Sequence, residues 1–428
     1  MERLLQSKYF HVGISALITA LIFIVYSNTF NASFHFDDIP QIVENYLIRD
    51  LGNLGQILSG ARGVTMATFA LNYAVGGLDV TGYHIVNTLI HAVNAILAYF
   101  LVYNILTLIT KDSFEWCKKI AAYSALIFAV HPIQTQSVTY IVQRMESLSS
   151  MFYLIALYLF IRAVKSSKSR VRVAMYVAVV FSFFLSFKSK EIAITLPALL
   201  LLMDYFFVSG RDLSKLISRW PVHGAVWLLF IYFAVSTVAP MGGFGDLSVE
   251  SAGMGAKIVS PVGEGASAGF GVKSITPWEY LLTQFNVIVY YLALLLVPIN
   301  QNLDYDFPEA SGLFSTPALH EGTVLNLPVW PPVVSLIILV MIVAAAFWLF
   351  MKSKSGTMPR ALTASFFIFW FFILISPTSS FIPIIDVIFE HRVYMASLGF
   401  FVIFSLCLDY IFSARSRSEK QEVSDQIK

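Results

Sequence analysis

Charged side chains are scarce in this chain. Of its 428 residues 13% are Asp, Glu, Lys or Arg, whereas 57% are hydrophobic and 15% are aromatic. Soluble domains carry roughly 25% charged residues, so this composition excludes an ordinary soluble protein. Apolar runs of about 17–25 residues, which cross a ~30 Å hydrocarbon layer as helices, recur almost to residue 412. We therefore predict an all-α polytopic membrane protein with about 10 to 11 transmembrane helices.

Cysteines and a signal-peptide cleavage pattern are also lacking. The chain has only Cys117 and Cys407, which gives no basis for a disulfide framework. No small-residue cleavage pattern follows the first apolar run, about residues 11–30, and we interpret that run as a retained helix. The net charge of +2 says little as a total, and we expect no nucleic-acid partner. The placement of Lys and Arg is more informative, because these residues mark cytoplasmic loops.

The positions of the basic residues predict the topology. Lys8 and the basic linker 162–172 are expected in the cytoplasm. Residues 31–82 then form a long external loop with short interfacial helices, among them a weakly amphipathic piece around Val64–Tyr73. Residues 1–412 form the transmembrane domain, and 413–428 a short charged cytoplasmic tail.

Two further segments are predicted to be external. Residues 241–277 are rich in Gly, Ala and Ser and are interpreted as a flexible loop, and residues 300–332 contain no Lys or Arg. The apolar run at about 279–298 cannot cross once between two external segments. We predict that it is re-entrant or interfacial; the alternative is an error of one crossing in the preceding helices.

Asp37 and Asp38 follow the first apolar run directly. An Asp costs roughly 3 kcal/mol at the centre of a membrane helix, so this pair belongs at the water-facing end. A carboxylate there can take a proton from an attacking hydroxyl; the alternative is a helix cap or a solvated loop acid. No cofactor is certain. A divalent cation at Asp37 and Asp38 is possible, although two adjacent acids lack a specific ligand spacing.

Other polar residues gather on the predicted external side, each beside an apolar run. They are Gln143, Arg144 and Glu146, then Lys188, Lys190 and Glu191, then Asn300, Asp304 and Asp306, and last Glu390, His391, Arg392 and Tyr394. Arg binds phosphate through a bidentate fork, so this mixture of acids and cations suggests group transfer from a lipid phosphate. The alternative is that the cations are snorkelling anchors and that the acids lie in solvated loops.

The second predicted helix, about residues 83–109, carries a polar face. His84, Asn87, His91 and Asn94 follow at spacings of three, four and three residues and therefore share one side of the helix. Such a face in a bilayer usually pairs with neighbouring helices through hydrogen bonds. His84 lies nearest the external end and is also a candidate for the site.

An ordered set of motifs resembles the C-type (GT-C) glycosyltransferases. The closest resemblance is to the transmembrane region of the transmembrane-and-TPR-containing O-mannosyltransferases and their bacterial relatives. The motifs are Phe36-Asp37-Asp38, Tyr83-His84 with Asn87 and His91, His131-Pro132, Arg144-Met145-Glu146-Ser147, Ser189-Lys190-Glu191, Asn302-Leu303-Asp304-Tyr305 and Glu390-His391-Arg392-Val393-Tyr394. The resemblance implies a GT-C-like bundle that transfers a sugar, with inversion, from a dolichyl- or undecaprenyl-phosphate type donor. The acceptor would be a hydroxyl of a protein or glycan on the external face.

The resemblance also implies roles for residues of this chain. Asp37 or Asp38 would be the general base, and Arg144, Lys190 and Arg392 would bind the donor phosphate. Supporting residues would be His84, Glu146, Glu191, Asp304, Glu390, His391 and Tyr394. The chain departs from the family in two places. The tetratricopeptide array that follows the membrane region in the family is missing from this sequence, so protein-acceptor recognition is not assumed. Met395-Ala396-Ser397 stands where relatives tend to have a proline.

The resemblance implies one of two membranes. The site would face the periplasm from a bacterial inner membrane, or the lumen from the membrane of the endoplasmic reticulum. The alternative function is a transporter, flippase or scaffold for lipid-linked sugars. A transporter would place paired acids and broken half-helices near the bilayer midplane, whereas the charges in this chain lie mostly at helix ends.

Overall fold

The structure is a computed structural model that describes residues 5–110, 113–238, 268–270, 272–319, 325, 327–353 and 358–426, with side chains to residue 413. Within this part of the chain the regular elements are helices, and a single isolated bridge joins Ala268 to Ile384. This confirms the predicted all-α class. Most of the predicted loop 241–277 lies outside the described residues.

Most helices coincide with the apolar runs of the sequence. They are α2 (Phe10–Tyr26), α3 (Leu54–Ser59), α4 (Gly63–Gly76), α5 (Val80–Ile109), α6 (Phe114–Val130), α7 (Thr135–Thr139), α8 (Arg144–Lys165), α9 (Ser169–Phe187), α10 (Leu196–Met203), α11 (Leu213–Ile217), α12 (Trp220–Val238), α13 (Pro277–Leu296), α14 (Pro332–Lys352), α15 (Pro359–Ile375) and α16 (Ser397–Gln426). Short 3-10 and π turns connect them, among them η2 (Ile39–Val43), η5 (Pro132–Gln134), η6 (Ile141–Gln143), η7 (Glu191–Thr195), η8 (Asp204–Val208) and η10 (Glu390–Val393).

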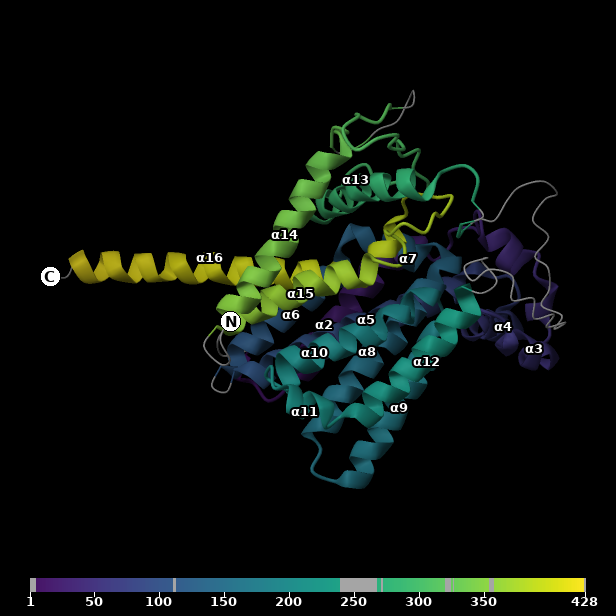
Figure 1. Cartoon of the computed structure of the whole chain (residues 1–428). Helices are drawn as coiled ribbons and strands as arrows, with labels where there is room; N and C mark the ends of the chain where they lie inside the picture. The colour runs from purple at the N-terminus through teal and green to yellow at the C-terminus, as the bar shows by residue number, and fades with distance from the viewer. Residues whose placement is uncertain are drawn as a thin grey trace.

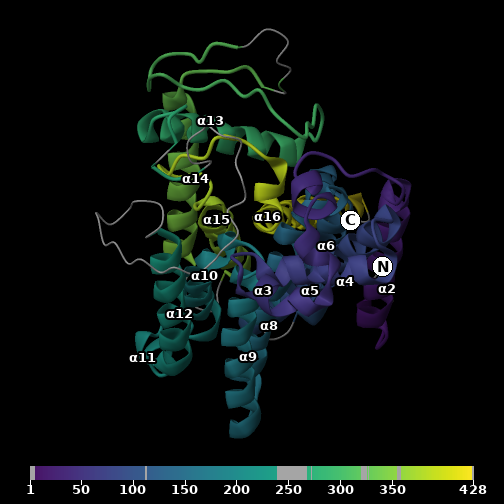
Figure 2. The same ribbon diagram turned by 90° about the vertical axis from the view of Figure 1, so that its right-hand side faces the viewer.

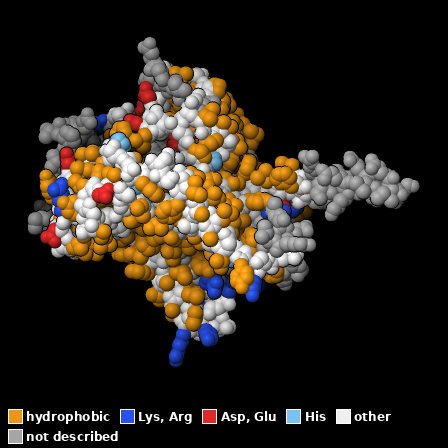
Figure 3. Space-filling view, turned by 180° about the vertical axis from the view of Figure 1, so that it is seen from behind, with side chains coloured by type: hydrophobic (Ala, Val, Ile, Leu, Met, Phe, Trp, Pro, Cys, Tyr) orange, Lys and Arg blue, Asp and Glu red, His pale blue; other side chains and the backbone are white. Residues whose placement is uncertain are grey.

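By length and composition, seven helical segments in the described part can cross a membrane. They are Phe10–Thr29, Val80–Ile109, Ile141–Lys165, Ser169–Phe187, Glu191–Val208, Pro277–Leu296 and Pro332–Lys352. Shorter apolar helices cover Trp220–Ser236, Pro359–Ile375 and Ser397–Ser413. The chain is an integral membrane protein; its orientation and its particular membrane stay predictions. Figure 3 shows the broad hydrophobic surface, with Lys and Arg gathered at the lower end, where the α8–α9 connection lies in Figure 1.

Helix α5 is the centre of the bundle. Asp79 caps its first turn by accepting a hydrogen bond from the Thr81 N–H at 3.0 Å. The helix packs against α2, α6 and α8; α8 packs in turn against α9, and α16 against α6 and α15. Both termini lie toward one end of the molecule, and α3 and α4 lie at the other (Figure 1). The α16 backbone continues as a helix through the predicted tail to Gln426.

Helix α13 lies across the bundle. Figure 2 looks along the bundle from the α3–α4 end and shows α13 extended across the view, whereas α15 and α16 are seen close to end-on. The hydroxyls of Tyr280 and Tyr291 donate to the carbonyls of Thr378 and Phe389 at 2.6 and 2.8 Å. The helix therefore packs on the loop after α15, which is predicted to be external. This contact favours an interfacial position for the run at 279–298, although its length also permits a crossing, and its topology stays a prediction.

Candidate functional site

Asp37 lies exposed on a strained turn after α2. Phe36, the residue before it, has a φ of 46°, a backbone conformation that is a real outlier for a bulky residue and costs roughly 1–3 kcal/mol. The Asp37 backbone N–H donates to the Tyr140 hydroxyl at 2.8 Å. Burial, and secondly the Asp37 charge, raise the pKa of this hydroxyl. Tyr140 therefore stays a neutral phenol that holds the turn and keeps the Asp37 carboxylate at the surface.

Asp38 points the other way, into the protein, and is 1% exposed. Its Oδ1 accepts a hydrogen bond from the Val142 N–H at 2.7 Å, and its Oδ2 accepts one from the His35 N–H at 3.1 Å. Burial raises the pKa of this carboxyl to about 6, although both hydrogen bonds favour the charged form. Asp38 thus fastens the turn to the segment before α8, and Asp37 is the acid that can meet a substrate.

Arg62 stands at the start of α4, and its side chain is 42% exposed. Its Nη2 and Nε donate to Glu191 Oε2 at 3.0 and 3.2 Å, and its Nη1 contacts the Met145 sulfur at 3.2 Å. Burial disfavours the guanidinium charge, but Glu191, with smaller contributions from Glu146 and Asp37, raises the pKa of Arg62 overall. Arg62 is therefore a permanent, half-exposed cation within the electrostatic reach of Asp37.

The position of Arg62 depends on a tight turn between α3 and α4. A Cβ on Gly63 would lie 2.5 Å from the Ile57 carbonyl oxygen, so no larger residue fits there without a backbone shift. Lys188 joins this turn to the end of α9: its Nζ donates to the carbonyls of Ser59 and Gly60, and its own carbonyl accepts from the Val64 N–H. The loop that is predicted to be external is thereby docked on Lys188, the residue before the Ser189-Lys190-Glu191 motif.

Lys190 is a second cation of the site and is mostly buried. Its Nζ pairs with Glu146 Oε2 at 2.9 Å and donates to Gln143 Oε1 at 3.1 Å. Burial lowers the pKa of Lys190, and Glu146 opposes this effect. A small cavity beside Glu146 is also lined by Ser150 and Arg392, and Glu146 Oε1 has no hydrogen-bond partner within the described residues.

Glu390 holds the loop that carries Asp304 through hydrogen bonds to three residues of this loop. Its carboxylate accepts hydrogen bonds from the Tyr305 hydroxyl, from the Asn302 N–H at 3.1 Å and from Gln301 Nε2 at 2.6 Å. Burial raises the pKa of Glu390, and these donors oppose the rise. The two predicted motifs around residues 304 and 390 therefore meet as one unit, in which the Asp304 side chain stays exposed.

Gln136 on α7 joins this unit to His391. Its Oε1 accepts from the His391 N–H at 2.6 Å and lies 2.9 Å from His391 Nδ1, while its Nε2 donates to the Leu303 carbonyl at 2.9 Å. Burial, followed by the charges of Lys190, Arg392 and Arg62, lowers the pKa of His391 well below its ordinary value. His391 is therefore neutral at physiological pH, and its contacts with Gln136 connect η10 to α7.

Arg392 and Asp386 are the remaining charged residues of the candidate site. Arg392 Nη2 and Nη1 donate to the carbonyls of Asp386 and Val387 at 2.6 and 3.2 Å. Asp386 reaches water, yet desolvation by the surrounding protein raises its pKa; Arg392 opposes the rise, and Asp304 and Asp37 add to it. Acids from three separate loops are thus near one another. Within the described residues no group of three or more His, Cys, Asp or Glu is arranged to hold a metal ion.

Arg144 does not face this site. It is fully buried, its Nε donates to Asn87 Oδ1 and its Nη1 to Asn72 Oδ1, both at 2.6 Å, and its Nη2 donates to the Tyr83 carbonyl at 3.0 Å. Its guanidinium carbon lies 4.5 Å from the Phe69 ring centroid. A phosphate contact would require Arg144 to leave these partners, so we assign it a structural role that joins α4, α5 and α8.

His84 and Tyr394 also serve the packing of the helices. His84 Nε2 lies 2.9 Å from the Ala32 carbonyl and ties α5 to the segment after α2. The Tyr394 hydroxyl meets His91 Nδ1 at 2.8 Å and Asn94 Nδ2 at 3.0 Å. The polar face of α5 is thus the hydrogen-bonded ladder that its spacing predicts, and His84 lies on it as an anchor of the first loop.

Seven of the predicted site residues form one electrostatic neighbourhood: Asp37, Glu146, Lys190, Glu191, Asp304, His391 and Arg392. Glu390 borders it through its hydrogen bonds to the Asp304 loop, and Asp38 through the turn that carries Asp37. Arg144, His84 and Tyr394 make their contacts within the helix packing instead. The sequence analysis did not find Arg62, Gln136 or Asp386. Only Gln136 carried a usable signal, since it follows the His131-Pro132 motif closely.

Comparison with known proteins supports the family resemblance. A family model described as dolichyl-phosphate-mannose-protein mannosyltransferase matches residues 78–238. Protein O-mannosyl-transferase TMTC3 of Mus musculus is 30% identical over 215 residues, which are 47% of this chain and 22% of that protein. Tmtc1 of Drosophila melanogaster is 29% identical over 221 residues, 48% of this chain and 24% of that protein. The chain thus aligns with about a fifth to a quarter of these relatives. No solved structure matches it.

Proposed function

We propose that this chain is a membrane glycosyltransferase that moves a hexosyl unit from a polyprenyl-phosphate donor to a hydroxyl acceptor, with inversion at the anomeric carbon. The observation that carries the proposal is a group of charges: the exposed Asp37 carboxylate lies within electrostatic reach of the half-exposed Arg62 guanidinium, which in turn lies within reach of the Lys190 ammonium. The names of the relatives, protein O-mannosyl-transferases, favour mannose as the sugar and a protein as the acceptor.

Asp37 would act as the general base. It takes the proton of the acceptor hydroxyl as that oxygen attacks the anomeric carbon, a role that contributes typically 10²–10⁴-fold in rate. Asp38 does not touch the substrate; it fixes the turn that carries Asp37 through the Val142 and His35 N–H groups. Preorganisation of this kind avoids moving the base during the reaction.

Arg62 and Lys190 would receive the leaving phosphate. As the new glycosidic bond forms, the bond from the anomeric carbon to the phosphate oxygen breaks, and its electron pair stays on the lipid phosphate. Fixed cations at that oxygen stabilise the developing charge. Arg62 is a better phosphate ligand than Lys190, because its guanidinium can bind two phosphate oxygens at once. Its Nη1 contacts only the weak acceptor Met145 Sδ and is therefore able to turn to a phosphate oxygen. Attack by the acceptor opposite the phosphate gives inversion in one displacement.

A divalent cation would fit this site only with help from the substrate. Asp37, Asp304 and Asp386 offer hard oxygen ligands, but the described residues form no complete ligand set, and Mg²⁺ usually takes one or two carboxylates together with substrate phosphate and water. The residues that we assign to base and phosphate binding do not depend on such a cation. We also propose that the site faces the periplasm or the lumen, in keeping with the predicted external position of Asp37.

The test is transfer of a radiolabelled sugar in detergent micelles, from synthetic polyprenyl-phosphate mannose to hydroxyl peptides and glycans. Micelles have no two sides, so a covalent product identifies a transferase and excludes a pure transporter or flippase. Arg62→Gln and Lys190→Gln should each lower kcat/KM by about 10²-fold or more. Lys215→Gln is the matched control, because Lys215 is an exposed cation in another part of the chain. Full activity of both site variants would overturn the assignment.

A further inference from the structure

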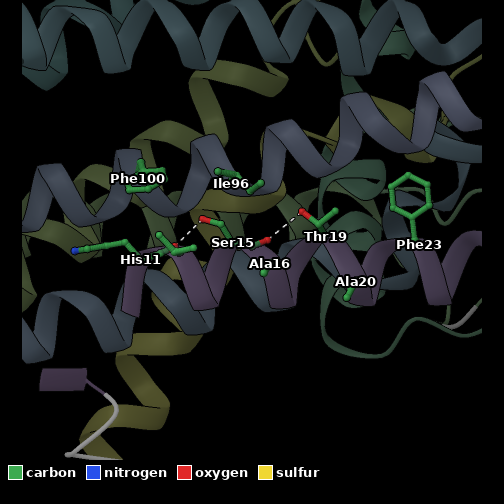
Figure 4. A pocket seen from close by; sticks show the side chains of 9 residues that line it. His11, Ser15, Ala16, Thr19, Ala20, Phe23, Ile96 and Phe100 are labelled. Carbon is green, nitrogen blue, oxygen red and sulfur yellow. Dashed lines mark hydrogen bonds between the residues drawn. The ribbon is translucent and has the colours of Figure 1, made fainter. Parts of the chain in front are cut away.

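A long apolar groove runs along the outside of α2, where this helix packs beside α5. Its volume is about 720 Å³. The floor is made of small side chains, Ser15, Ala16, Thr19 and Ala20, and the hydroxyls of Ser15 and Thr19 bond to the carbonyls four residues earlier. Because these hydroxyls are satisfied within the helix, the groove presents an apolar surface (Figure 4).

Aromatic side chains stand at both ends of the groove. Figure 4 shows His11 and Phe100 at one end and Phe23 at the other. The His11 ring stacks on Phe100 with the centroids 5.9 Å apart, and its Nδ1 bonds to the Tyr99 hydroxyl at 2.8 Å. The groove thus has rigid ends and a smooth floor, a shape that suits one flexible hydrocarbon chain.

The groove extends over most of α2. From residue 11 to residue 23 a helix rises about 18 Å, a little more than half of the ~30 Å hydrocarbon layer, and α2 itself covers Phe10–Tyr26. The His11 end of the groove lies at the start of α2, whereas Asp37 follows the C-terminal end of this helix. A lipid whose phosphate lies at the His11 end is therefore distinct from the polyprenyl-phosphate donor, whose phosphate we place at Arg62.

Two cations lie near the His11 end of this groove, at the start of α2. Lys8 is exposed, with its Nζ 4.9 Å from the Tyr9 ring centroid. Lys118 Nζ lies 5.5 Å from the ring centroid of Phe10, the neighbour of His11, and donates to the Leu5 carbonyl at 2.6 Å. Within the described residues neither Lys is paired with an acid, in contrast to Lys119, which binds Asp409.

We propose that the groove binds one acyl chain of an anionic phospholipid in the leaflet where α2 begins, with its phosphate between Lys8 and Lys118. Juxtamembrane Lys residues attract anionic lipid by roughly 1 kcal/mol each, and the apolar floor adds burial of the chain. The bound lipid fills the side of α2 that α5 leaves open and stabilises the helix that leads to the Asp37 turn.

The experiment uses the full chain in phosphatidylcholine vesicles that contain a small fraction of phosphatidylglycerol with a photoreactive diazirine in one acyl chain. After illumination the labelled peptides are identified by mass spectrometry. Labelling should concentrate on 10–26 relative to the exposed face of α14. Ala16→Leu with Ala20→Leu fills the floor and should abolish that preference. Ala344→Leu with Ala345→Leu makes the same enlargement on the exposed surface of α14 and should leave it intact.

The charge is tested separately. Lys118→Gln should lower labelling of α2 about fivefold, the equivalent of ~1 kcal/mol, and Lys168→Gln, which removes an exposed charge at the α8–α9 connection, should not. Diazirine-tailed phosphatidylcholine should label α2 less and should not respond to Lys118→Gln. Equal labelling of α2 and α14, or labelling of α2 that survives the filled groove, would overturn the proposal, as would an equal preference for the two lipids.

Discussion

The two adjacent acids offer the sharpest test of the proposed site, because Asp37 is exposed and Asp38 is buried, and we propose opposite roles for them. Asp37→Asn removes the proposed base and changes no buried contact. Loss of a general base costs about 10²–10⁴-fold in kcat, which corresponds to ~3–5 kcal/mol in the barrier. Asp37 is exposed, and surface substitutions usually change stability by less than ~0.5 kcal/mol. We therefore expect a folded, nearly inactive protein.

Asp38→Asn should behave differently. The amide oxygen can still accept one of the two N–H groups, but the other N–H then faces an NH₂ and loses its partner, at a cost of roughly 1–3 kcal/mol. Against this, the buried carboxylate with a pKa of about 6 carries an ionisation cost near pH 7, about 3 kcal/mol for a rise of roughly two pKa units, which Asn removes. The net change in stability is small, and activity should fall by no more than about tenfold.

The assay is mannosyl transfer in micelles with the thermal unfolding temperature measured on the same preparations. Matched amounts of wild type, Asp37→Asn and Asp38→Asn are compared near pH 7.5. The reasoning fails if Asp37→Asn keeps more than a tenth of the activity, or if Asp38→Asn is the dead variant while its unfolding temperature is unchanged. That second result would make Asp38 the base and Asp37 the positioning acid.

Three other perturbations follow from the same contacts. Arg144→Lys should lower the free energy of unfolding by roughly 3–5 kcal/mol, because acceptors such as Asn72 lose a buried donor; denaturation in detergent measures it, and an unchanged donor KM in the folded fraction separates it from a ligand contact. Glu390→Gln should release the Tyr305 loop and raise proteolysis within residues 300–306, and intact resistance would contradict the clamp. As the pH rises from about 4 to about 6, the unfolding temperature of the wild type should fall relative to that of Asp38→Asn. The raised pKa of Asp38 means that in this range the folded state still holds a proton which the unfolded state has released. Parallel curves for the two proteins would refute the burial of Asp38.

The helices could be predicted from the sequence because burial in lipid requires long apolar runs. The run predicted at about 83–109 ends with α5 at Ile109, and the run predicted at about 11–30 covers most of α2. The prediction was less successful where the chain turns without changing composition. The apolar segment Glu191–Val208 is divided into η7, α10 and η8, since Pro197 and the π turn at Asp204 alter the backbone while the side chains stay mostly apolar.

The site was only partly visible in the sequence. Arg62 lies between Gly60 and Gly63, with no neighbouring motif to mark it. Its position depends on the contact of the α3–α4 turn with Lys188, a residue 126 positions later in the chain. No local pattern contains such a contact, because it results from the docking of a loop on the end of a helix. Asp386 was hidden for the same reason, as it approaches Asp304 only through the Glu390 clamp.

Neighbouring residues of one motif point in different directions, so that one residue faces the candidate site and the other packs within the fold. On α8, Arg144 and Glu146 are two residues apart and therefore point to nearly opposite sides of the helix: Arg144 reaches α4 and α5, and Glu146 reaches Lys190. Asp37 and Asp38 do the same across one peptide bond. A motif read as a string attributes function to all of its members, whereas the geometry separates the member that meets substrate from the member that holds it in place. By this argument the loss of Arg144 removes activity through the fold, and the loss of Arg62, which belongs to no motif, removes it at the phosphate.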